Sequence, residues 1–171
     1  MLCSMLDLIR RARDFGPRTA VLDSSGVHTY TDLVDAAERV ATGLMSRAGT
    51  RDLSESTVAY MIPPGFEYVA TQWGIWMAGG IAVPLSLSDS RRELLHKIAN
   101  SETTLLVCHP DCRGSVDGPA SECQVPLLEV SDLLGARAHL PDIDEGRRAL
   151  LLYTSGTTDH PKGVVVTHSN I

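Results

Sequence analysis

Residues 153–163, "YTSGTTDHPKG", combine hydroxyls, a glycine backbone and one cation between two apolar runs. The runs, 149–152 and 164–166, are short and aliphatic and are bounded by Gly or Pro, which is typical of buried strands. The stretch between them cannot bury apolar surface. It does offer hydroxyls, backbone N–H groups freed from crowding at Gly156, and the ammonium of Lys162. Small donors curled around an anion, with a point charge beside them, hold phosphate in proteins. The sequence therefore predicts a phosphate-binding loop between two strands.

Two other interpretations fit this stretch less well. A Ser/Thr/Gly surface turn would account for any one of these residues alone, but not for their combination with Lys162 at this spacing. A Walker A loop requires Gly-Lys-Ser/Thr in that order at the start of a helix. Here Lys162 precedes Gly163 and three valines follow, which predicts a strand. A P-loop kinase or ATPase is therefore disfavoured.

The segment from Tyr153 to Val164 resembles the signature loop of the adenylate-forming (AMP-binding) enzymes. These include acyl-CoA synthetases, peptide-synthetase adenylation domains and luciferases. The family pattern is Tyr-Thr-Ser-Gly-Thr-Thr-Gly-x-Pro-Lys-Gly-Val, and this sequence departs from it at Asp159, where the family has Gly. "HTYTDLVDAAERVATGL" and "QWGIWMAGGIAVPL" are similar to further segments of the family.

The tryptophans of the second segment, Trp73 and Trp76, resemble the malonyl-CoA synthetase branch in particular. From the residues themselves, we expect Trp73, Trp76 and Met77 to be core residues rather than a ligand site.

The resemblance implies an acid–thiol ligase, an acyl-CoA synthetase. In this family a carboxylate attacks the α-phosphorus of ATP, with Mg²⁺ shielding the phosphates, and coenzyme A then displaces AMP from the acyl-adenylate. Tyr153 is expected to pack, and His168 to lie at a helix start. No catalytic residue and no metal ligand is assigned. Carried over residue by residue, the β- and γ-phosphates would be held by Thr154, Ser155, Gly156, Thr157, Thr158 and Lys162.

The resemblance also limits what these residues can do. In the family, the adenine pocket, the acyl pocket, the metal motif and the C-terminal catalytic domain follow the point that matches Ile171. We therefore expect residues 1–171 to be an incomplete N-terminal portion of an AMP-binding domain, inactive in isolation, with the C-terminal catalytic domain absent. The alternative is a non-catalytic short form that binds polyphosphate or a protein partner.

Composition sets further bounds. With 171 residues, 43% hydrophobic and 21% charged, the chain has the size and composition of one globular domain. A formal net charge of −6 without a Lys/Arg cluster argues against nucleic acid as a partner. Cys108, His109 and Cys112 lack a second ligand pair at zinc spacing, so we expect unpaired thiols in a reducing compartment.

The start of the chain bears on localisation. "MLCSMLDLIRRARDF" is apolar and then basic, the reverse of a secretory signal. Its arginines could belong to a mitochondrial presequence, but Asp7 and Asp14 favour a first structural helix. Residues 68–87 carry no charge, yet Gly79, Gly80 and Pro84 would break a membrane span. We expect an intracellular protein, mitochondrial or cytoplasmic, without a transmembrane segment.

The elements alternate between strands and helices, which predicts an α/β fold with a mixed, largely parallel sheet flanked by helices. Thr31 is expected to cap the first long helix, and Ser90 with Glu93 forms a capping box for a later one. Residues 109–124, rich in Gly, Pro, Ser and Asp, are predicted to be a flexible loop. The other expected strands cover 19–23, 27–30, 58–62, 81–85, 103–108 and 125–130, and a further helix covers 66–78.

Overall fold

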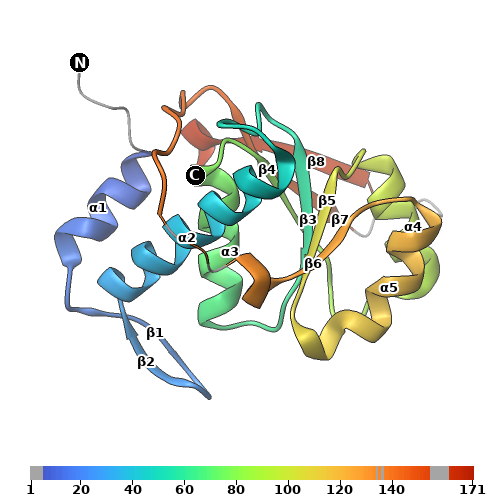
Figure 1. Ribbon diagram of the computed structural model, residues 1–171, viewed down its shortest axis with the longest axis horizontal. Helices are drawn as coiled ribbons and strands as arrows, with labels where there is room; N and C mark the ends of the chain where they lie inside the picture. The colour runs from blue at the N-terminus through green and yellow to red at the C-terminus, as the bar shows by residue number, and fades with distance from the viewer. Residues whose placement is uncertain (1–5, 134, 136, 155–161) are drawn as a thin grey trace.

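The computed structural model describes residues 6–133, 135, 137–154 and 162–171. Its main sheet has the strand order β6-β5-β3-β4-β7-β8 (Figure 1). Neighbouring strands from β6 to β7 run parallel, and β8 is antiparallel to β7. The predicted mixed, largely parallel sheet is confirmed. The strands are β3 (Thr57–Met61), β4 (Ile81–Pro84), β5 (Leu105–Cys108), β6 (Leu127–Glu129), β7 (Arg148–Thr154) and β8 (Lys162–Thr167).

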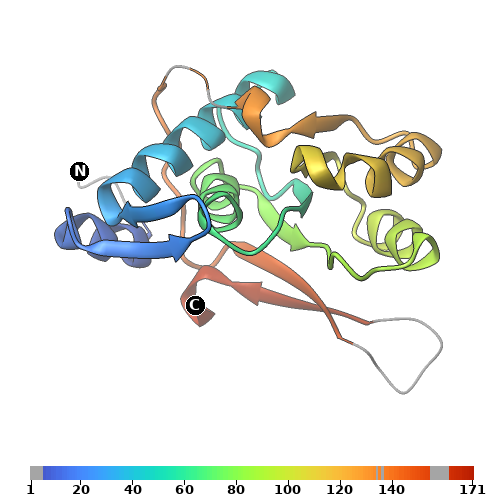
Figure 2. The same ribbon diagram turned by 90° about the horizontal axis from the view of Figure 1, so that it is seen from below.

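Helices cover both faces of this sheet, and a small hairpin stands beside it (Figures 1 and 2). One face packs against α1 (Asp7–Phe15), α2 (Tyr30–Ala48) and α3 (Phe66–Met77). The other packs against α4 (Arg91–Asn100) and α5 (Arg113–Glu122). The hairpin consists of β1 (Thr19–Asp23) and β2 (Gly26–Thr29), and three short 3₁₀ turns are η1 (Pro110–Cys112), η2 (Val130–Leu133) and η3 (His168–Asn170).

Side chains along the central strands point alternately to the two faces of the sheet, and this produces two separate hydrophobic cores. Val58 and Tyr60 of β3 belong to the core under α2 and α3, whereas Ala59 and Met61 belong to the core under α4 and α5. Successive side chains of a strand point to opposite faces, so a strand with helices on both sides is apolar at every position. This explains why the run in β3 lacks a polar alternation.

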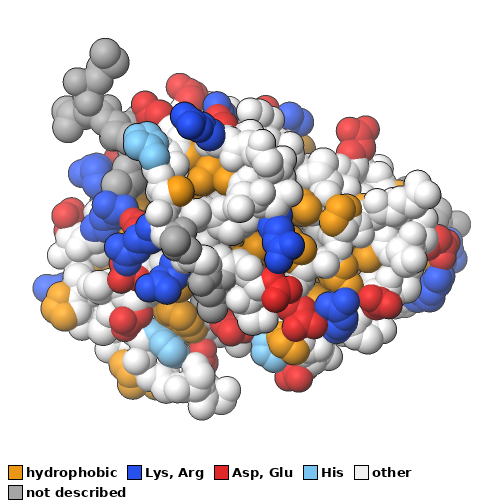
Figure 3. All heavy atoms as spheres, viewed as in Figure 1, with side chains coloured by type: hydrophobic (Ala, Val, Ile, Leu, Met, Phe, Trp, Pro, Cys, Tyr) orange, Lys and Arg blue, Asp and Glu red, His pale blue; other side chains and the backbone are white. Residues whose placement is uncertain are grey.

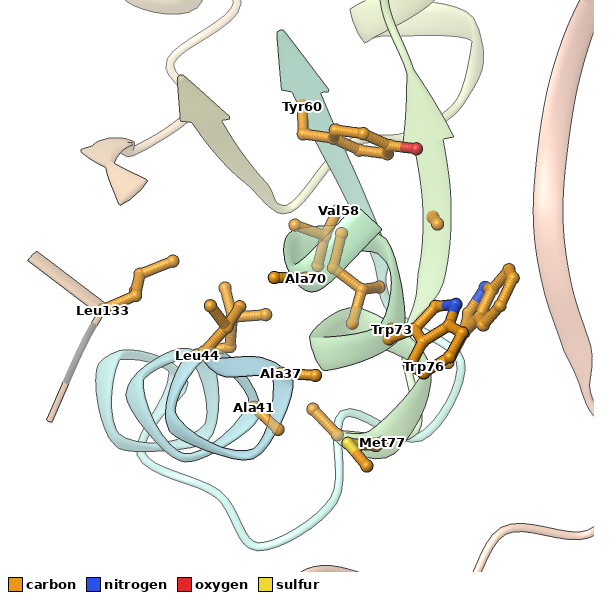
Figure 4. Close-up of a cluster of buried hydrophobic side chains, with 14 of the residues drawn as sticks. Ala37, Ala41, Leu44, Val58, Tyr60, Ala70, Trp73, Trp76, Met77 and Leu133 are labelled. Atoms are coloured by element: carbon orange, nitrogen blue, oxygen red, sulfur yellow. The ribbon is translucent and has the colours of Figure 1, made fainter. Parts of the chain in front are cut away.

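The tryptophans of α3 lie in the first core, as predicted (Figure 4). Trp73 is 7% exposed, Trp76 3% and Met77 5%. Trp76 also makes a specific contact, because its Nε1 donates a hydrogen bond to the carbonyl of Ala149 at 2.7 Å. A buried indole N–H needs a partner, and here the partner lies at the start of β7. The core thus connects α3 to the strand that leads into the predicted phosphate loop.

The residues of the uncharged stretch 68–87 are divided between α3 and β4, as predicted. Gly79, at φ +80°, ends the turn after α3, a conformation that favours glycine. Within residues 6–133, 135, 137–154 and 162–171, no helix is long and apolar enough to cross a membrane.

The first helix is structural, as its two aspartates suggested. Ile9 and Ala12 of α1 are buried in the first core. Two of its basic side chains pair with acids: Arg10 with Asp7 at 2.7 Å, and Arg13 with Glu38 of α2. Figure 3 shows basic and acidic side chains interspersed over this face of the molecule. Two of the three arginines of α1 therefore form ion pairs within the fold.

The helix starts are partly as predicted. Ser90 accepts a hydrogen bond from Glu93 N, and Glu93 accepts one from Ser90 N, which confirms that capping box. For α2 the prediction was wrong by two residues. Thr29, not Thr31, is the N-cap and exchanges hydrogen bonds with Asp32. The acid at the third helical position makes Thr29 the better cap, because both orphan N–H groups are then satisfied.

The prediction of a loop at 109–124 was wrong, since this region contains η1 and α5. Its glycines and Pro119 have low helix propensity. Val116 and Ala120, however, lie four residues apart on one helix face and are buried in the second core. Tertiary burial of that face outweighs the local preference, as it commonly does for short helices.

Candidate nucleotide-binding site

The two strands around the predicted loop form an antiparallel hairpin that extends from the body of the protein (Figure 2). Its register runs from Arg148 opposite Thr167 to Thr154 opposite Lys162. Thr154 and Lys162 are both exposed, and Thr154 Oγ1 donates to the Lys162 carbonyl at 3.5 Å. The hairpin thus brings the first and last predicted phosphate ligands together. The other four, Ser155, Gly156, Thr157 and Thr158, lie outside the described residues, as does Asp159.

The pairing of β7 with β4 determines at which edge of the sheet the end of this hairpin lies. Leu150 pairs in parallel with Ala82 of β4, so the end of β7 at Thr154 points the same way as the carboxyl ends of β3, β4 and β5. In open α/β sheets, ligands bind outside the carboxyl ends of the strands. Thr154 and Lys162 therefore lie at the edge of the sheet where a ligand is expected.

Two arginines hold the base of the hairpin. Arg147 makes a two-point ion pair with Asp52, at 3.0 and 2.9 Å. Glu55 accepts from the Arg148 backbone N–H at 2.6 Å and from its guanidinium at 3.0 Å. Burial opposes ionisation of Asp52, but hydrogen bonds from Arg147 and from the Ser54 backbone outweigh it, so the pKa of Asp52 lies below its usual value. These pairs fix the end of the hairpin that is farthest from the predicted loop.

A tyrosine holds the other end. The Tyr153 hydroxyl donates to Asn100 Oδ1 at 2.8 Å and reaches the Lys97 carbonyl at 3.3 Å, both on α4. Its ring packs against the second core, as expected. Burial raises the pKa of Tyr153, so the side chain is a neutral donor at pH 7. The sequence predicted the packing but not this hydrogen bond.

Lys97 itself takes part in a buried ion pair that the sequence did not reveal. Its Nζ lies 2.6 and 2.7 Å from the two carboxylate oxygens of Asp89, and both side chains are less than 10% exposed. The ammonium also lies 5.9 Å from the ring centroid of Tyr153. In the sequence this pair is only an acid, Asp89, directly before the capping Ser90 and eight residues before a lysine. That spacing is too common to predict a buried ion pair.

His168 opens a 3₁₀ turn, consistent with the expected helix start. Its ring contacts Trp76 edge-on, with centroids 5.9 Å apart. Burial and the charge of Arg147 lower the pKa of His168 to about 4. It is therefore neutral at pH 7 and acts as a packing residue.

Cys108, the last residue of β5, and Cys112 of η1 are buried. Burial raises the pKa of Cys108 to about 11 and also raises that of Cys112, so both are thiols at pH 7. In the described part of the chain, no three His, Cys, Asp or Glu residues come together in a way that could hold a metal ion.

A mixed, largely parallel sheet with helices on both faces is the fold expected of the N-terminal domain of the adenylate-forming enzymes. The family model "AMP-binding enzyme" matches residues 8–171, and the chain belongs to this family.

The curated relatives are CoA ligases. The chain is 34% identical to human "Malonate--CoA ligase ACSF3, mitochondrial" over 94% of its own length and 30% of that protein. It is 33% identical to "Feruloyl-CoA synthase" from Amycolatopsis sp, over 95% of this chain and 33% of that protein. The chain thus spans about a third of the length of these relatives.

Solved structures confirm the fold. Apo MatB from Rhodopseudomonas palustris superposes with a TM-score of 0.80 at 26% identity, over 96% of this chain and 35% of that one. A benzoate CoA ligase from Burkholderia xenovorans LB400 gives 0.82 at 20% identity, over 95% and 34%, a likeness of fold alone. The chain therefore belongs to a family whose curated relatives named above are CoA ligases.

Proposed function

We propose that this chain supplies the ATP-polyphosphate site of an acid–thiol ligase that converts a carboxylic acid, ATP and coenzyme A into an acyl-CoA, with Mg²⁺. The observation that carries the proposal is Thr154 opposite Lys162 at the carboxyl edge of the sheet, within an AMP-binding family match that covers residues 8–171. Both side chains are exposed at the hairpin end, which suits a triphosphate that enters from solvent.

The role proposed for this hairpin is electrostatic stabilisation of the phosphates. Attack of a carboxylate on the α-phosphorus leaves pyrophosphate, on which negative charge accumulates. A fixed cation and fixed hydroxyl donors at that position stabilise the charge without reorganising during the reaction. In this role Lys162 supplies the cation. Thr154 and the loop residues 155–158 supply hydroxyl and backbone donors. Mg²⁺ would be bound through the phosphates, and no residue is assigned to it or to coenzyme A.

Malonate is the first acid to test, and mitochondria the first compartment. The support is the identity to proteins named malonate–CoA ligase, mitochondrial, together with the tryptophan pair at Trp73 and Trp76. The complete gene product, assayed for malonate-dependent CoA thioester formation beside ferulate and benzoate, is expected to prefer malonate. Imaging of a C-terminally tagged gene product tests the compartment.

Polyphosphate binding is tested directly on the 171-residue chain. Calorimetric titration with MgATP and with sodium tripolyphosphate is expected to give binding that Lys162→Ala weakens. Arg39→Ala, which removes an exposed cation from α2, is the matched control. Titrations that show no binding, or equal affinities for the parent and Lys162→Ala, would overturn the proposal.

Catalysis by the same chain is a separate question. Adenylate formation requires the α-phosphate, the carboxylate and the metal to be oriented together, and these residues supply a polyphosphate site. We therefore expect no carboxylate-dependent ATP–pyrophosphate exchange from the 171-residue chain. Polyphosphate binding by this chain, combined with no ligase activity from the gene product, would instead support the non-catalytic short form.

A further inference from the structure

The loop end of the β7–β8 hairpin has little support from the sheet itself. Within the described residues, the register of β7 with β4 consists of one pair, Leu150 with Ala82. β4 ends at Pro84, and the last residues of β7 pair with β8, which is the end strand of the sheet. A two-stranded hairpin alone is marginally stable in water. Side-chain contacts must therefore fix where Thr154 and Lys162 lie.

Those contacts come from α4 and converge on Tyr153. The hydroxyl donates to Asn100 Oδ1 at 2.8 Å, and the Lys97 carbonyl lies 3.3 Å away. The ring meets that of His96 edge-on at 6.2 Å between centroids. Tyr153 immediately precedes Thr154, so its side chain fixes the backbone at the point where the strand ends. Leu151 adds apolar packing on the same side of the strand.

The helix that receives Tyr153 is itself held in place. The ion pair between Lys97 and Asp89 is buried on both sides, and Asp89 also accepts from the Ser86 backbone at 2.9 Å. This ties the last turn of α4 to the segment that follows β4. Because β4 is central in the sheet, a continuous set of contacts runs from the sheet through Asp89 and Lys97 to Tyr153.

We infer that Tyr153 and Asn100 are positioning residues for polyphosphate binding: their hydrogen bond holds Thr154 and Lys162 in register with the sheet. The inference rests on the proposed function. Neither residue touches the phosphates in this account. Without the bond, the hairpin end pivots about Leu150, and the bound position of Lys162 is populated for a smaller part of the time. The apparent affinity for polyphosphate falls in proportion to the population of that position.

The test compares Tyr153→Phe and Asn100→Ala with two controls in the 171-residue chain. Tyr153→Phe removes the hydroxyl and keeps the ring, so the core stays filled. Asn100→Asp keeps an acceptor oxygen and is the rescue variant. Tyr30→Phe is the matched control, because it removes a hydroxyl at the start of α2. Each variant is measured by amide hydrogen exchange of peptides covering 148–154 and 162–167, and by tripolyphosphate titration.

We expect Tyr153→Phe and Asn100→Ala to speed exchange in these two peptides and to weaken tripolyphosphate binding, each about fivefold, which is the net worth of one hydrogen bond. Exchange in β3 and β5, and both readouts for Tyr30→Phe, should stay at parent values. Asn100→Asp should restore hairpin exchange to near the parent value. A purely structural role would lower the melting temperature without changing the affinity of the folded chain.

Parent-like exchange and affinity in both loss variants would overturn the inference while leaving the proposed function intact, provided that Lys162→Ala still weakens binding. If the parent chain does not bind tripolyphosphate, the proposed function fails and the claim about phosphate affinity fails with it. The exchange data then still decide whether the bond anchors the hairpin.

Discussion

Thr154 and Lys162 face each other as the last register pair of the β7–β8 hairpin. Eight positions separate them in sequence, and the strand pairing places their backbones side by side at the carboxyl edge of the sheet. Both residues are exposed at this end of the hairpin.

The departure from the family pattern at Asp159 should weaken nucleotide binding. A carboxylate ~6 Å from a phosphate charge is repelled by roughly 3 kcal/mol at an effective dielectric of ~20. We predict that Asp159→Gly tightens MgATP by about tenfold, or ~1.4 kcal/mol. Calorimetric titration of both forms checks this. Equal affinities would mean that the carboxylate does not face the phosphates.

The Arg147–Asp52 pair should stabilise the fold in a pH-dependent way. Asp52 has a folded-state pKa below its unfolded value. Its contribution is therefore present above the unfolded pKa and is lost as pH falls through the folded one. Asp52→Asn should cost about 1–2 kcal/mol at pH 7, allowing for partial exposure. Urea unfolding from pH 7 down to 3 should show the two forms converging. A constant gap across that range would contradict this account.

His168 should make stability fall in mild acid. Its folded-state pKa of about 4 lies below the ordinary 6.5, so between these values the unfolded chain binds the proton more readily. Stability should therefore drop as pH falls from 6.5 towards 4, by on the order of 2 kcal/mol. His168→Gln should flatten this part of the curve, whereas His139→Gln, at an exposed position, should not. Parallel curves for the parent and His168→Gln would rule out this role.

Trp76→Phe should destabilise the fold more than Trp73→Phe. Both changes remove part of a buried indole from α3, but the first also leaves the Ala149 carbonyl without its donor. We expect an excess of about 1–2 kcal/mol in the free energy of unfolding. Chemical denaturation of the two variants is the measurement. Equal losses would show that the hydrogen bond to β7 contributes nothing beyond packing.

The hairpin should make the 171-residue chain prone to self-association. Val164 is 47% exposed and Val165 52%, on the end strand of the sheet. Exposed apolar residues on an edge strand, one side of which has no neighbouring strand, favour association. The chain should bind a hydrophobic dye, and Val164→Thr with Val165→Thr should reduce the signal. Leu87→Thr, which changes an isolated exposed residue, is the control. A monomer that binds no dye and melts sharply would contradict this.

The sequence by itself determined the two strands on either side of the predicted phosphate loop, the buried helix at Trp73 and Trp76, and the capping box at Ser90. These features are local, because apolar runs, turn residues and caps act within a few positions. The family assignment also followed from a contiguous motif. It required no knowledge of distant contacts.

Only the tertiary structure decided the rest. Residues 113–122 form a helix although their composition favours a loop, because the burial of Val116 and Ala120 depends on a core built by distant segments. Tyr153 donates a hydrogen bond to Asn100, 53 residues away in sequence. Arg147 pairs with Asp52, 95 residues away. Pairings at such distances depend on strand order and helix placement, which local pattern does not encode. They determine where the hairpin lies and hence where Lys162, a predicted phosphate ligand, is placed.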